Sequence, residues 1–271
     1  MHDDQENLNR LFSLMVKIKW TNSERYRDGV MGILKDCETA DEFRAVEHVL
    51  TDLKYCTSTD LDIASLNIAK VIQTNWNLNP QDTIIVGVAE PNKTCGSTAF
   101  VRSIENRLPK CWEKSIHTNF VSAFRHRDGK PNLIIADDFI GTGNKLLTRI
   151  QRIKNNPKTA NYVIHVAAFA GMKFGINAVA TAISGRIHAE VHLDKCISGA
   201  QPPQKSLELT AGMTSIEKKI FQKPGAYSFG YGQSEAAFFL EAANIPNNNF
   251  PILWWEKYAD NTDRATLFTR R

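Results

Sequence analysis

The feature that most constrains this chain is residues 132–145, which read NLIIADDFIGTGNK. The apolar run Leu133–Ala136 predicts a short buried strand. Asp137 and Asp138 stand where that strand should end, and the turn Gly141–Gly143 precedes a helical pattern. Turn amides at a helix N-terminus attract anions, and carboxylates accept sugar hydroxyls or Mg²⁺. The order strand, acidic pair, glycine turn, helix therefore predicts a site for a phosphorylated sugar.

The stretch resembles the signature by which type I phosphoribosyltransferases bind 5-phosphoribosyl-1-pyrophosphate (PRPP). That signature has four apolar residues, two acidic residues, two more apolar residues and a Thr/Gly-rich loop. The positions that match are Asp137, Asp138, Ile140, Thr142 and Gly143. Gly141 stands where the family usually has Thr or Ser, and Asn144-Lys145 stands where it usually has small residues. Without the resemblance, these residues also fit a solvent-capped strand end in an unrelated α/β protein.

The resemblance implies a role for each part of the stretch. Asp137 and Asp138 would form the catalytic pair, holding the ribose hydroxyls or a Mg²⁺ cofactor. The 5′-phosphate would bind to the loop of Gly141, Thr142, Gly143, Asn144 and Lys145. Lys145 adds positive charge to that loop, and it also adds bulk.

A second segment repeats the order strand, loop, helix. Thr83–Val88 predicts a buried strand, and a helical pattern begins at Thr98. The loop between them resembles in position the phosphoribosyltransferase loop that binds the pyrophosphate of PRPP. Its candidate contacts are Glu90, Lys93, Thr94 and Ser97. A charged lysine favours phosphate binding, but Lys93 is explained equally well as a solvated loop residue.

Three further segments predict strands: His117–Phe124, Tyr162–Ala168 and Arg186–Leu193. With the two already described, and with helices between them, they indicate an α/β fold with a doubly wound, mainly parallel sheet. Such sheets bind ligands at the carboxyl ends of their strands. The resemblance narrows this to the type I phosphoribosyltransferase fold, with an N-terminal helical extension and a C-terminal hood.

Histidines near the predicted sheet offer few chemical roles. Arg186–Leu193 alternates apolar and polar residues, which predicts an edge strand with one wet face. His188 and His192 share its polar face, where metal binding is conceivable and plain solvation is the commoner outcome. His126, in the turn before the signature strand, is the one acid–base candidate nearby.

The flanking regions complete a division into three segments, 1–80, 81–195 and 196–271. Apolar residues at helical spacing predict helices in the first segment, and Thr21/Glu24 and Thr39/Glu42 fit capping boxes. This region carries no evident chemistry, so we interpret it as a helical support or a partner-docking surface. The second segment is the predicted phosphoribosyltransferase-like core, and the third is the predicted hood.

Composition excludes several classes of protein. Apolar residues make up 42% and charged residues 23% of the 271 residues, with a formal net charge of +4. This is ordinary for a soluble folded protein, and the longest apolar runs are too short to span a bilayer. The polar N-terminus predicts no signal peptide. Five scattered cysteines without a Cys-x-x-Cys pair indicate reduced thiols, and we therefore expect a cytoplasmic protein.

The predicted hood carries the most specific resemblance. Asp137–Gly143, the turn Phe229–Gly232 and the segment Asn244–Trp254 together resemble a branch of phosphoribosyltransferase-like proteins from bacterial antiviral defence loci, some beside retron reverse transcriptases. In phosphoribosyltransferases the hood holds the acceptor, usually a base. Phe229 and Tyr231 are the candidates for stacking on it, unless they are hood core.

These features leave two main hypotheses and a weaker one. The first is an antiviral effector that binds PRPP or a nucleotide, with Mg²⁺, and acts at ribose C1. The second is a non-catalytic subunit of the same fold that senses a nucleotide or binds a partner; the candidate partner is a reverse transcriptase with its DNA. The third is direct nucleic-acid binding through basic segments such as Arg125–Lys130.

Overall fold

The chain forms two compact units. The structure, a computed structural model, describes residues 2–22, 24–89, 96–125, 129–221, 223, 225–241 and 243–270. Unit 1 comprises residues 1–55, 194–239 and 244–271, and unit 2 comprises residues 56–193 and 240–243. The contacts therefore divide the chain differently from the three predicted segments. Residues 56–80 belong to the sheet-containing unit 2, whereas residues 1–55 pack with the C-terminal part of the chain.

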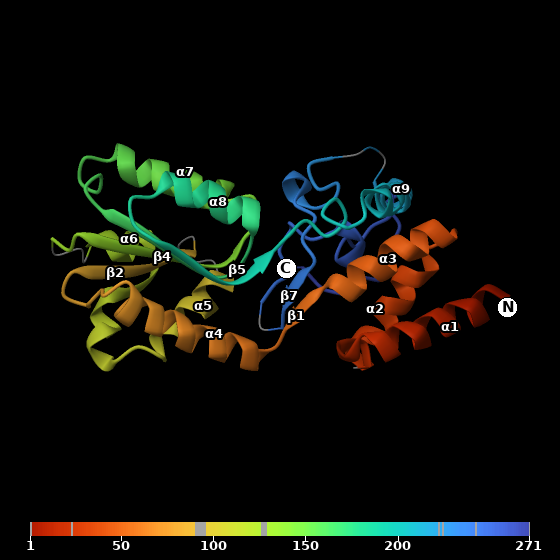
Figure 1. Ribbon diagram of the computed structural model, residues 1–271, viewed down its shortest axis with the longest axis horizontal. Helices are drawn as coiled ribbons and strands as arrows, with labels where there is room; N and C mark the ends of the chain where they lie inside the picture. Colours follow the sequence, from red (N-terminus) through yellow and green to blue (C-terminus); the bar gives the residue numbers. More distant parts are fainter. Residues whose placement is uncertain are drawn as a thin grey trace. The chain divides into compact units, whose positions relative to one another are not determined.

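Unit 2 is built on a five-stranded parallel sheet in the order β3-β2-β4-β5-β6 (Figure 1). Its strands are β2 (Thr83–Ala89), β3 (Ile116–Asn119), β4 (Asn132–Ile140), β5 (Val163–Met172) and β6 (Ile187–Leu193). The α/β class and the parallel sheet are confirmed, and β6 is an edge strand as predicted. The three inner strands are almost wholly apolar because helices cover both of their faces.

The helices of unit 2 lie on both faces of this sheet. They are α4 (Ser58–Lys70), α5 (Gly96–Glu105), α6 (Phe120–Arg125), α7 (Asn144–Asn155) and α8 (Lys173–Ala182). A π-helical turn, Val71–Asn75, continues α4, and a 3₁₀ segment, Lys110–Ser115, precedes β3. Within this unit α6, α7 and α8 cover one face and α4 and α5 the other (Figure 1). The core between the sheet and α6, α7 and α8 is made mainly of Ile, Leu and Val side chains.

Two predicted strand boundaries are wrong. The strand predicted over His117–Phe124 ends at Asn119, where α6 begins. The Asn119 side-chain oxygen accepts a hydrogen bond from the Ser122 backbone N–H at 3.0 Å, and this cap starts the helix. In contrast, β4 does not end at Ala136 but runs on to Ile140, so the acidic pair lies within the strand.

Unit 1 is mainly helical. Its helices are α1 (His2–Lys17), α2 (Glu24–Lys35), α3 (Ala40–Asp52) and α9 (Pro203–Ile220), with 3₁₀ segments at Lys19–Asn22, Tyr231–Gln233 and Pro251–Leu253. The short strands β1 (Lys54–Cys56) and β7 (Phe238–Leu240) pair as a two-stranded sheet. The predicted Thr39/Glu42 capping box is present at the start of α3, whereas the Thr21 side chain lies outside the described residues. None of the helices that the structure describes combines the length and apolar character that crossing a bilayer requires.

A buried ion pair joins the N-terminal helices of unit 1 to its C-terminal segment. Arg264 Nε donates to Asp36 Oδ2 at 2.8 Å, and both side chains are at most 5% exposed. The other guanidinium nitrogens donate to the carbonyls of Trp255 and Ile252, and Tyr258 donates to Asp36 Oδ1. Every charged atom thus has a partner, which is what makes burial of the pair tolerable.

We expect Arg264→Met to destabilise the protein by about 3 kcal/mol, because the substitution leaves the buried Asp36 carboxylate without its cation. Urea unfolding followed by circular dichroism measures this. The control is Lys257→Met, which breaks the exposed Lys257–Asp263 pair and should cost less than about 1 kcal/mol. Equal effects of the two substitutions would show that the buried pair does not secure the C-terminal segment.

Candidate functional site

The candidate site lies where the strand order of the unit 2 sheet reverses. From β2 the chain crosses to β3 on one side and then returns to β4 on the other side. In open α/β sheets, ligands bind at such a reversal, at the carboxyl ends of the two strands where it occurs, which here are β2 and β4. Residues 90–95 after β2 lie outside the described residues, so the described part of the site is the end of β4 and the starts of α5, α7 and α8.

Asp137 is buried within β4, near the carboxyl end of the strand, and is paired with Lys145 in the first turn of α7. It is 1% exposed. The Lys145 ammonium lies 3.2 Å from Oδ1 and 3.5 Å from Oδ2 of this carboxylate. A buried carboxylate needs such a partner, because an unpaired charge in a poorly solvated place is costly. Lys145 itself remains largely exposed, with 56% of its side chain accessible.

Asp138 is the chemically unusual member of the pair. Burial and the neighbouring Asp137 charge raise the pKa of Asp138 to about 7, although Lys145 acts in the opposite direction. Its carboxylate lies against the first residue of α5, so that a Cβ on Gly96 would fall 1.9 Å from Oδ2. A larger residue at position 96 would therefore have to displace the Asp138 carboxylate. The positive end of the α5 helix dipole also faces this carboxylate.

The loop after β4 has the geometry of an anion cradle. Gly143 has a φ of +81°, which an L side chain rarely adopts, and this turn lets α7 begin at Asn144. The Asn144 backbone N–H donates to Thr142 Oγ1 at 3.4 Å. The first amides of an α-helix have no partner within the helix, so the start of α7 offers donors to an anion. Gly141, Thr142 and Gly143 thus form the turn that the sequence predicts.

The Gly141–Gly143 loop packs against the start of a third helix, α8, a contact that was not predicted from the sequence. A Cβ on Gly175, in the first turn of α8, would fall 1.9 Å from the Gly141 carbonyl oxygen. A Cβ on Gly143 would in turn fall 3.0 Å from the Gly175 carbonyl oxygen. A small residue just after β5 was the available signal for this contact. Because the loop backbone packs directly on α8, its shape depends on Gly175.

The acidic pair fits Mg²⁺ only in part. Its carboxylate oxygens are the hard donors that Mg²⁺ prefers, and this ion usually keeps other ligands from water or from phosphates. Lys145 already neutralises Asp137, and the described residues contain no group of three or more His, Cys, Asp or Glu that could hold a metal. Asp137 and Asp138 would thus face a Mg²⁺ that arrives with the phosphate oxygens of a ligand.

The remaining predicted contacts fall in different places. Ser97 is fully buried in the first turn of α5. It follows Gly96, the residue that lies against the Asp138 carboxylate. The other predicted pyrophosphate-loop residues, Glu90, Lys93 and Thr94, lie outside the described residues, as does His126. Their roles stay predictions.

The two aromatic candidates for base stacking belong to unit 1. Phe229 is half-buried against Phe250, with ring centroids 6.0 Å apart, and its backbone N–H donates to the buried Glu217 carboxylate at 2.8 Å. Tyr231 is 38% exposed beside Tyr227. The contacts of Phe229 are those of a core residue, whereas Tyr231 presents an accessible ring. A base-stacking role for either residue stays a prediction.

The histidines of β6 have ordinary partners. His188 Nε2 lies 2.7 Å from a Glu190 carboxylate oxygen, and His192 Nε2 lies 3.0 Å from the Ala189 carbonyl. Glu190 also accepts a hydrogen bond from Asn67. These contacts favour the interpretation of His188 and His192 as solvated strand residues.

Comparison with known protein families agrees with this architecture. The model of the family PRTase-CE matches residues 34–270, which is most of the chain. The chain belongs to the PRTase-CE family. It is therefore phosphoribosyltransferase-like, and the parallel sheet with its reversal of strand order confirms the predicted type I phosphoribosyltransferase fold. No curated protein matches the chain. The family match spans both units, so the PRTase-CE architecture includes α3 and the C-terminal segment as well as the sheet.

We expect Gly175→Ala to weaken phosphate binding by the loop about tenfold or more, because the new methyl group must displace the Gly141 carbonyl. Isothermal titration with ribose 5-phosphate measures this. Gly225→Ala is the matched control, since a Cβ there meets no atom closer than 4.0 Å. Unchanged affinity in Gly175→Ala would mean that the Gly141–Gly143 loop does not bind the phosphate.

The raised pKa of Asp138 predicts a pH dependence of stability. The folded protein holds a proton on Asp138 up to about pH 7, whereas an ordinary aspartate has a pKa of 3.8. This contribution is fully present below the unfolded pKa and is lost as the pH rises through the folded one. The free energy of unfolding of the wild type should therefore fall, relative to that of Asp138→Asn, between about pH 4 and pH 7. Urea titrations across this range test it, and parallel curves for the two proteins would contradict it.

Proposed function

We propose that the protein is a phosphoribosyltransferase-like effector of a bacterial antiviral defence system of the retron type. It binds PRPP or a nucleotide at the end of β4 and acts at the ribose C1. The observation that carries this proposal is the continuous arrangement of Asp137, Asp138 and the Gly141–Gly143 turn ahead of the α7 N-terminus. Family membership supports a ligand of this class.

Each part of the site has a place in the proposed reaction. The Gly141–Gly143 turn and the first amides of α7 hold the 5′-phosphate, with Lys145 as the nearest cation. Asp138 accepts a ribose hydroxyl or faces the magnesium that comes with the ligand. The bond from C1 to its leaving group breaks, and the leaving group keeps the electron pair. An acceptor base or water then forms the new bond at C1. Asp137 and Asp138 stabilise the cationic C1, and Mg²⁺, when bound, neutralises charge on the leaving phosphate.

The defence role rests on the resemblance of three segments to the branch from antiviral loci, namely Asp137–Gly143, Phe229–Gly232 and Asn244–Trp254. In such a locus the effector is held inactive by a reverse transcriptase and its DNA product, which are the proposed partners. We place it in the cytoplasm, where PRPP, nucleotides and these partners occur.

The test is mass spectrometry of PRPP and a nucleotide panel incubated with the purified protein and Mg²⁺, alone and with the proteins encoded beside it. We expect one ligand to be consumed, with a product altered at C1. Asp137→Asn/Asp138→Asn should slow this by about a hundredfold or more, because it removes the charge that stabilises C1. Asp62→Asn, which alters an exposed pair with Arg107, is the control and should react normally. A panel that is neither bound nor consumed at millimolar concentration, or a fully active double variant, would refute the proposal.

One observation favours a second candidate, a non-catalytic sensor of the same ligands. The Lys145 ammonium sits on Asp137, so part of the negative charge that would stabilise a cationic C1 is already neutralised. The sensor is distinguished by tight ligand binding without any product, together with co-purification with a partner encoded beside it. Lys145→Ala separates the two candidates further, because it should raise turnover if the ion pair restrains catalysis, and should only weaken binding in a sensor.

A further inference from the structure

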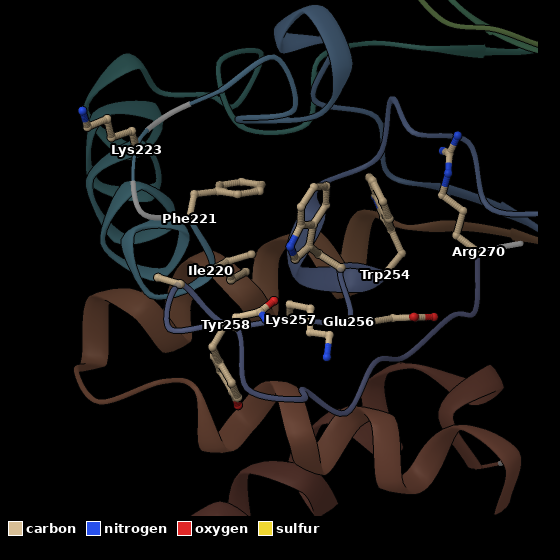
Figure 2. A pocket seen from close by; sticks show the side chains of 11 residues that line it. Ile220, Phe221, Lys223, Trp254, Glu256, Lys257, Tyr258 and Arg270 are labelled. Carbon is tan, nitrogen blue, oxygen red and sulfur yellow. The ribbon is translucent and has the colours of Figure 1, made fainter.

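Unit 1 contains a cavity of its own that no part of the proposed function uses. Its volume is about 700 Å³, within the range of small-molecule sites. It is lined by the end of α9, the residues just after it and the C-terminal segment. Four aromatic residues contribute to the lining, namely Phe221, Trp254, Trp255 and Tyr258. Figure 2 shows Phe221 and Trp254 among the lining side chains, with Lys223 and Arg270 at opposite sides.

The aromatic rings of this cavity leave room for a planar ligand. Phe221 and Trp255 are 4.9 Å apart at an interplanar angle of 73°, and Trp254 and Trp255 are 5.3 Å apart at 58°. Neither pair is parallel: Phe221 and Trp255 meet edge to face, Trp254 and Trp255 are tilted, and Tyr227 lies 5.7 Å from Trp255 at 48°. Phe221 and Trp255 are only half-buried and keep accessible ring surface. Stacking on such surface is how proteins hold nucleobases without reading their identity.

The charges around the cavity favour an anion. The lining carries three cations, Lys223, Lys257 and Arg270, against one acid, Glu256. Lys257 forms an ion pair with Asp263 at 2.6 Å, so Lys223 and Arg270 remain available to an anion. The Arg270 guanidinium lies over the Trp254 ring, 5.0 Å from its centroid, and has no carboxylate partner among the residues that the structure describes. An arginine held on an indole face next to stacking surface can bind a phosphate with two parallel N–H donors.

We infer that unit 1 holds a second binding site, for a nucleotide, in which the base stacks in the cavity against Phe221 and Trp255 and the phosphate binds Arg270. The site is complete within unit 1 and uses none of the residues of the β4 loop. It therefore suits an effector ligand that is bound and not converted. A cavity of this size matches a mononucleotide and is too small for several bases of a strand.

The scaffold under the cavity is fixed by contacts that a ligand does not need to make. Trp254 donates its indole N–H to the Asn249 carbonyl at 3.1 Å and is 7% exposed. Tyr258 donates its hydroxyl to Asp36, and burial together with this contact raises the pKa of Tyr258 to about 12. The rings, the Arg270 fork and Lys223 remain available for recognition, which predicts affinity for nucleotides in general and weak discrimination between bases.

The experiment is isothermal titration of the four nucleoside monophosphates into Gly175→Ala protein, in which we expect phosphate binding by the unit 2 loop to be weakened. We expect binding of all four, and binding of ribose 5-phosphate weaker by about tenfold or more, because it lacks the base. Arg270→Gln should weaken nucleotide binding by a similar factor. Lys218→Gln is the matched control: it removes one exposed positive charge from α9, near the cavity in sequence but not in its lining.

Four results would overturn the inference. They are no binding at millimolar concentration, equal binding of ribose 5-phosphate, equal losses in Arg270→Gln and Lys218→Gln, and tight binding of a single-stranded oligonucleotide where mononucleotides fail. Phe221→Leu keeps the apolar volume and removes the aromatic ring, and it should weaken nucleotides but not ribose 5-phosphate. Because the background variant distorts the phosphate loop of unit 2 and all readouts are of binding, these outcomes are independent of whether the proposed reaction at C1 occurs.

Discussion

Two adjacent carboxylates within a buried central strand, near its carboxyl end, are the constraint on which unit 2 depends. Neighbouring side chains in an extended strand point to opposite faces, yet these two carboxyl groups interact, and the Lys145 charge acts on both of them. The structure gives each carboxylate a different solution. Asp137 is paired with Lys145 from the following helix, while Asp138 lies against the start of α5 with its pKa raised to about 7. Gly96 leaves space for the Asp138 carboxylate, and the turn before α7 brings Lys145 close to Asp137.

The same arrangement sets what the site can bind. A phosphate that approaches the α7 N-terminus meets helix amides and Lys145, but also the negative charge of the acidic pair. The near-neutral pKa of Asp138 reduces that repulsion, because part of this carboxyl is protonated near pH 7. Lys145 contributes attraction to the phosphate only as far as it leaves Asp137. Lys145 stands where phosphoribosyltransferases usually have a small residue. It therefore acts directly on the acidic pair and only indirectly on a bound phosphate.

Much of unit 2 was predictable from residue patterns, because local chemistry decides it. The continuous apolar runs of β2 and β4 can only be buried strands between two layers of helices, and the alternation of β6 marks an edge. The Gly141–Gly143 turn was equally legible, since its glycines and the helical pattern after it are contiguous. The Lys145–Asp137 pair and the Gly175–Gly141 contact were not, because each joins residues that only the fold brings together. The Asn119 cap escaped notice because a strand-like run of apolar residues follows it.

Unit 1 shows why segment boundaries drawn along the chain failed to describe its packing. Two groups of polar contacts reach across almost the whole sequence, from Asp36 to Arg264 and from Glu42 to Ser215 and Lys219. Both acids are nearly inaccessible, so each needs its distant partners in order to be buried. No periodicity of the first helices reveals such a requirement, since amphipathic patterns report that a face is buried but not what covers it. The N-terminal helices are therefore part of the same compact unit as α9 and the C-terminal segment. The Asp36–Arg264 pair also supports the cavity wall at Trp254 and Trp255, because the Arg264 guanidinium donates to the carbonyls of Ile252 and Trp255.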